Sequence, residues 1–94
     1  MQRIDDDFDV IVAPDVGRAK TVSRLAADFG RQQVILIKQR DEQGQVRIEA
    51  VAGEVKGKRT VVVDDMIDTG GTMIEALKVL KDAGAKDIRI VAAH

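Results

Sequence analysis

Short apolar runs alternate along this chain with segments of helical periodicity. Four segments have the mostly continuous apolar character of strands buried on both faces of a sheet: residues 10–13, 34–37, 60–63 and 88–92. Two segments carry apolar residues every three or four positions and are followed by glycine, as amphipathic helices are: residues 19–29 and 73–83. The pattern therefore predicts strands separated by helices.

Strands that alternate with helices pair in parallel through right-handed crossovers. We therefore predict an α/β fold: an open, doubly wound, mostly parallel sheet of about four core strands. Residues 46–51 alternate loosely between polar and apolar and predict a half-exposed strand or hairpin arm. Residues 1–94 form one domain in this interpretation. Ligands of such sheets bind at the carboxyl ends of the strands, which here lead into the predicted loops 14–18, 38–45 and 64–71.

Composition narrows the classes of function. Apolar residues make up 45% and charged residues 33% of the chain, as in folded globular proteins. With two aromatic residues and a net charge of -1, the chain offers neither stacking platforms nor a basic surface for nucleic acid. Cysteine is absent, no apolar run is long enough for a membrane helix, and the start is acidic, unlike a signal peptide. We expect a cytoplasmic protein without a membrane or nucleic-acid partner.

The segment VVVDDMIDTGGT, residues 61–72, concentrates the candidate chemistry. Asp64 and Asp65 follow a buried strand, where carboxylates can accept hydrogen bonds from sugar hydroxyls or hold Mg²⁺. Residues 68–72 combine threonine and glycine ahead of a helix, where backbone N–H groups and the helix dipole attract an anion. Together these features describe a site for a sugar phosphate.

A purely structural explanation exists for the same segment. Thr69 or Thr72 can cap the helix, while Gly70 and Gly71 permit a tight turn and nearby carboxylates favour the helix dipole. The two adjacent acids at the end of a buried strand favour the functional interpretation.

These residues resemble a known family. The segment VVVDDMIDTGGTM looks like the phosphoribosyl-binding loop of the type I phosphoribosyltransferase fold, and its DDMIDTGGT variant is similar to that of ribose-phosphate pyrophosphokinases. Four further segments are similar to that family and stand in the same order: VIVAPDVGRAK, KQR, GEVKGKRTVVVDD and LKDAGAKDIRIVAAH. The resemblance covers nearly the whole chain but only the C-terminal half of such an enzyme. It implies that the chain is a fragment of a two-domain enzyme.

The resemblance assigns residues to ribose 5-phosphate. It implies that Asp64 and Asp65 bind the ribose hydroxyls. The 5-phosphate is then cradled by Asp68, Thr69, Gly70, Gly71 and Thr72.

The resemblance also assigns the loop after the first strand. It places Asp15, Val16 and Gly17 near the pyrophosphate and the cation, with Asp15 as the Mg²⁺ ligand. Family members commonly have a second glycine next, where this chain has Arg18. Arg18 is therefore either a harmless variant or an added positive charge that faces phosphate.

The segment Lys38-Gln39-Arg40 is similar to the mobile catalytic loop of the family. By this resemblance Lys38 and Arg40 are catalytic and stabilise the phosphates of ATP during transfer. Phosphoryl-type transfer depends on such cations because its transition state spreads negative charge over several oxygens. Residues 41–51 lack the proline and asparagine of the family, so we expect this loop to close differently.

The resemblance implies transfer of pyrophosphate from ATP to ribose 5-phosphate, giving phosphoribosyl pyrophosphate and AMP. Most of the ATP site would belong to the missing domain and a neighbouring subunit, so the chain alone is expected to be inactive and able to form a homo-oligomer. Two alternatives stay open. The chain can be a non-catalytic ribose 5-phosphate binding module or minimal scaffold, or a small phosphoribosyltransferase.

Overall fold

The computed structural model describes residues 7–14, 16–65 and 71–93. Its strands are β1 (Val10–Ala13), β2 (Gln32–Arg40), β3 (Val46–Ala52), β4 (Arg59–Asp65) and β5 (Asp87–Ala93). Its helices are the 3₁₀ turn η1 (Val16–Arg18), α1 (Ala19–Phe29) and α2 (Gly71–Asp82). Every strand and helix predicted from the hydrophobic pattern is confirmed.

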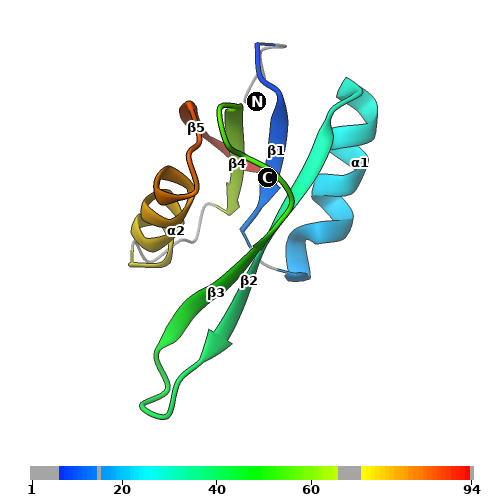
Figure 1. Ribbon diagram of the computed structural model, residues 1–94. Coiled ribbons are helices and arrows are strands. Elements are labelled where there is room, and N and C mark those ends of the chain that lie inside the picture. The colour runs from blue at the N-terminus through cyan, green and yellow to red at the C-terminus, as the bar shows by residue number, and fades with distance from the viewer. Residues whose placement is uncertain (1–6, 15, 66–70, 94) are drawn as a thin grey trace.

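The strands form one five-stranded sheet in the order β3-β2-β1-β4-β5. Strands β2, β1, β4 and β5 run parallel, whereas β3 is antiparallel to β2 and makes the edge hairpin (Figure 1). The predicted mostly parallel sheet with a hairpin arm is therefore confirmed. The strand order reverses at β1, which is where ligands bind in open α/β sheets.

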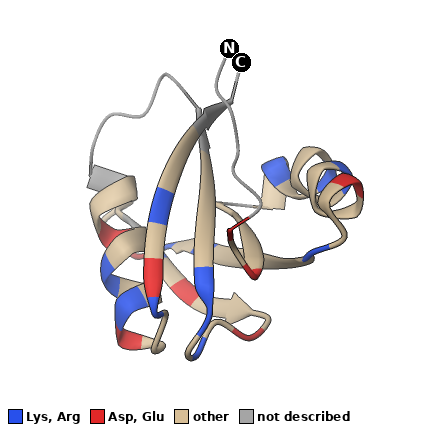
Figure 2. Cartoon of the chain, turned by 90° about the horizontal axis from the view of Figure 1, so that it is seen from above, with Lys and Arg blue, Asp and Glu red and all other residues tan. Residues whose placement is uncertain are grey.

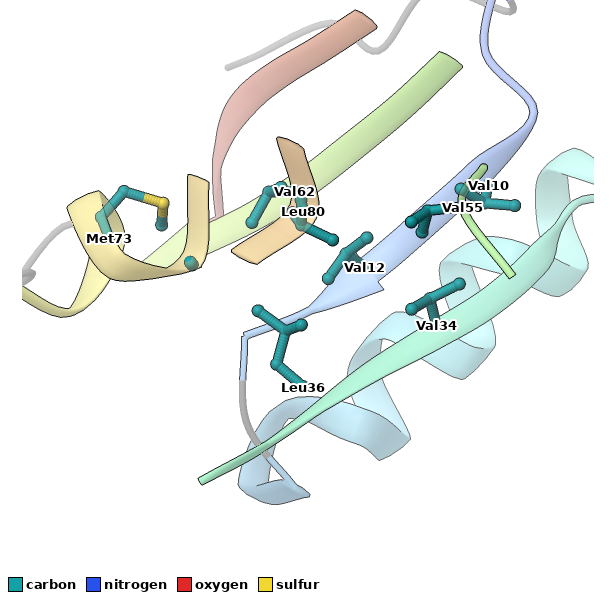
Figure 3. Close-up of a cluster of buried hydrophobic side chains, with 9 residues drawn as sticks. Val10, Val12, Val34, Leu36, Val55, Val62, Met73 and Leu80 are labelled. Carbon is teal, nitrogen blue, oxygen red and sulfur yellow. The ribbon is translucent and has the colours of Figure 1, made fainter. Parts of the chain in front are cut away.

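Helices α1 and α2 lie on opposite faces of the sheet, which makes the fold doubly wound (Figure 1). Alternate residues of β1 serve the two faces, as side chains on a strand must. Val10 and Val12 pack with Val62, Met73 and Leu80 beneath α2 (Figure 3). On the other face, β1 and β4 pack against α1 through Ile11, Ala13, Val22, Ala26, Val61 and Val63.

The expected loop 38–45 begins later than predicted. Residues Lys38 to Arg40 continue β2, and only residues 41–45 connect it to β3. The prediction of a loop from residue 38 was wrong because polar residues in an exposed hairpin lack the apolar pattern of a buried strand. Backbone pairing with β3 keeps them extended: Lys38, Gln39 and Arg40 lie opposite residues of that strand.

The chain returns from the hairpin past a glycine. Gly53 follows β3 with φ of +135°, a backbone conformation that other residues rarely adopt. A Cβ at this position would lie 2.8 Å from Cγ2 of Val34. Glycine is therefore needed where the chain leaves β3 and passes close to Val34 of β2.

Ion pairs fasten the amino ends of the central strands. The Arg59 guanidinium contacts both carboxylate oxygens of Asp9 at 3.2 Å and also pairs with Asp7. Arg89 contacts Asp7 at 3.5 Å. Charged residues lie mainly at the strand ends, in the turns and on the helices (Figure 2). This ionic cluster lies at the end of the sheet opposite the predicted site.

Candidate functional site

The carboxyl ends of the parallel strands meet at one edge of the sheet. Val12 of β1 pairs with Val34 of β2 and with Val62 of β4, so these three residues are level. Asp64 and Asp65 are the last two residues of β4 and pair with Ala92 and Ala93 at the end of β5. The two adjacent acids thus stand at the middle of the ligand-binding edge predicted for this fold. Their side chains lie outside what the structure describes.

The loop after β1 reaches the same edge. Val16, which is 64% exposed, and Gly17 form the 3₁₀ turn η1 with Arg18, and α1 begins immediately afterwards. Arg18 is half-buried and occupies the N-cap position of α1 without a side-chain cap. Asp15, the predicted Mg²⁺ ligand, lies outside the described residues. The order strand, loop and helix is as predicted, and the roles of these four residues stay predictions.

The predicted phosphate cradle coincides with the start of α2. Gly71 is the first residue of this 12-residue helix and Thr72 is the second. First-turn N–H groups have no partner within the helix, and the helix dipole gives this end a partial positive charge. Met73 is buried in the core and fixes the first turn against the sheet. Asp68, Thr69 and Gly70 lie outside the described residues.

Lys38 and Arg40 occupy the part of β2 that extends beyond β1. The ladder between β1 and β2 ends at the pair Ala13 and Ile35, five residues before Arg40. Lys38 pairs with Ile48, which packs against the core on the α2 face of the sheet. Directly opposite residues share a face, and residues two apart on a strand do so as well. Both cations are therefore presented on the α2 face, the face that also carries the start of α2.

The register sets the distance between the basic pair and the acids. Asp64 is two residues beyond Val62, and Lys38 is four residues beyond Val34, which is level with Val62. Two strand spacings of about 4.8 Å separate β2 from β4, and the offset of two residues adds about 6.6 Å along the strands, so roughly 12 Å separates the backbones of Lys38 and Asp64. That gap is of the size of a phosphorylated sugar.

Asp41 organises the turn between β2 and β3. Its Oδ1 accepts hydrogen bonds from the backbone N–H groups of Gln43 and Gln45, both at 2.9 Å. Its Oδ2 accepts from Arg47 Nε at 3.2 Å. Arg40 Nη1 in turn donates to the Gly44 carbonyl at 3.1 Å, which ties a predicted catalytic residue to the same turn. Sequence analysis missed this role, although an aspartate three residues before a glycine is a turn signal.

The hydrogen bonds hold the pKa of Asp41 below its usual value of 3.8. The Gln45 N–H makes the largest contribution, burial opposes it, and the Arg47 side chain and the Gln43 N–H add to the lowering. A carboxylate that accepts several N–H bonds is favoured in its charged form.

A cavity of about 250 Å³ lies on the same hairpin. Its lining consists of Gln39, Arg40, Asp41, Arg47, Ile48 and Glu49. The positive charges of two arginines are balanced by the negative charges of two carboxylates, so this cavity is not a simple anion site. Its lining residues beyond Arg40 were not predicted.

Within residues 7–14, 16–65 and 71–93, no three His, Asp or Glu side chains are arranged to hold a metal ion. Neither α1 nor α2 has the length and apolar character needed to cross a membrane.

Comparisons with known proteins agree with the geometry. The sequence model of the family described as "Phosphoribosyl transferase domain" matches residues 1–94. The ribose-phosphate pyrophosphokinase of Ureaplasma parvum is 44% identical over 84 residues, which are 89% of this chain and 26% of the relative. The predicted resemblance to ribose-phosphate pyrophosphokinases is thereby confirmed, and the chain spans about a quarter of the length of this relative.

Solved structures show the same fold. The phosphoribosylpyrophosphate synthetase from Mycobacterium smegmatis superposes with a TM-score of 0.77 at 41% identity, over 95% of this chain and 28% of that one. The purine phosphoribosyltransferase from Pyrococcus horikoshii Ot3 gives a TM-score of 0.76 at 30% identity, over 92% of this chain and 60% of that one.

The lowered pKa of Asp41 predicts a pH-dependent turn. Because the pKa is lower in the folded chain, the turn gains its full stabilisation above the unfolded value near 3.8 and loses it as pH falls through the folded pKa. In an NMR titration, the amide shifts of Gln43 and Gln45 should change together with a midpoint below 3.8, and Asp41→Asn should abolish that change. A midpoint at or above 3.8 contradicts this assignment.

Proposed function

Because the chain belongs to the phosphoribosyl transferase domain family, we propose that it is the C-terminal part of a ribose-phosphate pyrophosphokinase. It supplies the ribose 5-phosphate site of an enzyme that transfers pyrophosphate from ATP and releases phosphoribosyl pyrophosphate and AMP. Residues 1–94 act as one phosphoribosyltransferase-like domain of a two-domain enzyme. The identity of 44% to a ribose-phosphate pyrophosphokinase supports this proposal.

One observation carries the proposal. Strand β4 ends in Asp64 and Asp65 at the carboxyl edge of the sheet, and α2 begins at Gly71 after a connection of only five residues. A pair of carboxylates that can accept hydrogen bonds from a diol is thus followed at once by a helix start that can hold an anion. Asp64 and Asp65 bind the ribose hydroxyls in this proposal. The 5-phosphate lies against Asp68, Thr69, Gly70, Gly71 and Thr72.

The basic pair on the hairpin supports transfer rather than binding alone. In the proposed reaction, the ribose 1-hydroxyl oxygen forms a bond to the β-phosphorus of ATP, the bond from that phosphorus to the α-β bridging oxygen breaks, and the hydroxyl proton is lost. Lys38 and Arg40 stabilise the negative charge on the phosphate oxygens while the first bond forms and the second breaks. The loop of Asp15, Val16, Gly17 and Arg18 holds the pyrophosphate.

Magnesium fits the donors that this edge offers. Carboxylate and phosphate oxygens are the ligands that Mg²⁺ prefers, and two acids end β4 beside the loop that follows β1. We propose that Asp15 contributes a ligand together with the phosphates of the substrates. When bound, Mg²⁺ neutralises phosphate charge and fixes the orientation of the phosphates.

The remainder of such an enzyme supplies the adenine site and most contacts to ATP. Neighbouring copies in a homo-oligomer contribute to that site in this proposal, and the predicted cytoplasmic location is retained. Two alternatives compete with it. A non-catalytic ribose 5-phosphate module or minimal scaffold needs only the β4–α2 segment, and a small phosphoribosyltransferase is supported by the 30% identity to the purine enzyme.

Ribose 5-phosphate with Mg²⁺ should bind the chain through the β4–α2 segment. Asp65→Asn and Thr72→Val should each weaken binding in calorimetric titrations, Asp65→Asn by about tenfold because a charged hydrogen bond is lost. Asp82→Asn, an exposed acid at the last position of α2, is the matched control and should bind like the unaltered chain. Equal affinities for all of these proteins exclude the assigned site.

Phosphoribosyl pyrophosphate distinguishes an enzyme part from a simple binding module. Lys38→Met and Arg40→Met should each lower its affinity about fivefold, since each removes about one charged contact to the pyrophosphate. Their affinity for ribose 5-phosphate should change less than twofold. Lys78→Met, an exposed lysine on α2, serves as the control. If the two ligands lose affinity equally, or not at all, the module is the better interpretation.

A further inference from the structure

A hydrogen bond joins the hairpin that carries Lys38 and Arg40 to α2. The backbone N–H of Ile48, in β3, donates a hydrogen bond to Glu75 Oε1, in α2, at 3.4 Å. The two residues are 27 positions apart in the sequence, and both are half-buried. The contact therefore links two elements that the sheet ladder does not connect.

The hairpin needs support beyond the sheet. Past Ile35, strand β2 has β3 as its only partner among the described strands, because the ladder with β1 has ended. An isolated two-stranded ribbon is at best marginally stable in water. The β2–β3 ladder is also irregular between Ile37 and Lys38, where Glu49 has no residue opposite it. Figure 1 shows the hairpin reaching well past the rest of the sheet.

Helix α2 provides that support. Ile48 and Val51 of β3 pack against the core cluster that includes Met73 and Leu80 of α2. This apolar contact holds the hairpin near the helix but is not directional. The hydrogen bond to Glu75 is directional, and it fixes one point of β3 relative to α2.

That point is opposite a predicted catalytic residue. Ile48 pairs directly with Lys38, immediately after the irregular position. At the other end of the contact, Glu75 follows Gly71 by four residues, so it lies about 6 Å along the axis from the start of α2. Glu75 thus connects the backbone beside Lys38 with the first turns of the helix that begins at the proposed phosphate cradle.

We infer that Glu75 is a positioning residue, which holds the β2–β3 hairpin so that Lys38 and Arg40 face a phosphate-bearing ligand bound at the start of α2. The role as an anchor follows from the contacts alone, whereas the identity of the ligand rests on the proposed function. Glu75 touches no ligand in this account and acts through Ile48. From its sequence position alone, Glu75 is an ordinary polar residue of an amphipathic helix.

Amide hydrogen exchange of the unliganded chain tests the anchor. In Glu75→Ala, the Ile48 amide should exchange about tenfold faster, because its charged acceptor is lost. Glu75→Gln keeps a side-chain oxygen acceptor and should restore most of the protection. The buried β1 amides should exchange at the same rate in both variants as in the unaltered chain. This result separates local release of the hairpin from global unfolding. Glu42→Ala, in the exposed hairpin turn, is the control for a lost acid.

Titration with two ligands tests the positioning. Glu75→Ala should lower the affinity for phosphoribosyl pyrophosphate about threefold, which is less than the effect expected of Lys38→Met. The affinity for ribose 5-phosphate should stay unchanged. Equal Ile48 exchange in Glu75→Ala and the unaltered chain overturns the anchor, and an unchanged affinity for phosphoribosyl pyrophosphate overturns the positioning. If the unaltered chain binds neither ligand, the proposed function and the positioning role fail, while the exchange result still decides the anchor.

Discussion

The parallel pairing of β1 with both of its neighbours is the constraint on which the rest of the structure depends. This four-residue strand is almost completely buried, and it separates the cores beneath α1 and α2. Because Val12 pairs with β2 on one side and β4 on the other, the carboxyl ends of these strands come to one edge. Every element of the proposed site leaves from that edge: η1 from β1, the basic hairpin from β2 and the acidic segment from β4.

The shortness of β1 has a second consequence. Strand β2 has nine residues and runs on after β1 has ended, so its basic end is carried on a two-stranded hairpin rather than within the sheet. The hairpin depends on Asp41 at its turn and on α2 at its base. Proposed binding and proposed catalysis are therefore assigned to different parts of the fold. The sugar phosphate is placed at the sheet edge and the helix start, and the transfer residues on the hairpin, where β3 is the one partner strand of β2 among the described strands.

Much of this fold can be predicted from sequence because its buried strands are continuously apolar. Residues 10–13 and 61–63 are apolar at every position, as expected of strands covered on both faces, and glycine marks the end of each helix. The end of β2 could not be predicted in this way, because Lys38, Gln39 and Arg40 are extended only through pairing with β3. The bond from Ile48 to Glu75 depends on tertiary contact between distant segments, so no local pattern indicates it.

The residues of the candidate site also differ in whether the sequence alone could predict them. The acids and glycines of residues 64–72 were found because their types and spacing suit a sugar phosphate. Of these residues the structure describes Asp64 and Asp65 at the end of β4 and Gly71 and Thr72 at the start of α2. The roles of Asp15, Val16, Gly17 and Arg18 came from family resemblance and stay predictions. Asp41 was missed although its spacing to Gly44 is a turn signal, whereas Glu75 has no local signal that separates it from other polar residues of an amphipathic helix.

The central claim is that the carboxyl edge between β4 and α2 binds ribose 5-phosphate, and amide shift mapping by NMR tests it most directly. Addition of ribose 5-phosphate with Mg²⁺ should shift the amides of Asp64, Asp65, Gly71 and Thr72 the most. The opposite end of the sheet carries its own cations, Arg59 and Arg89, held by Asp7 and Asp9. Largest shifts at that end, or no shifts at the start of α2, would contradict the account.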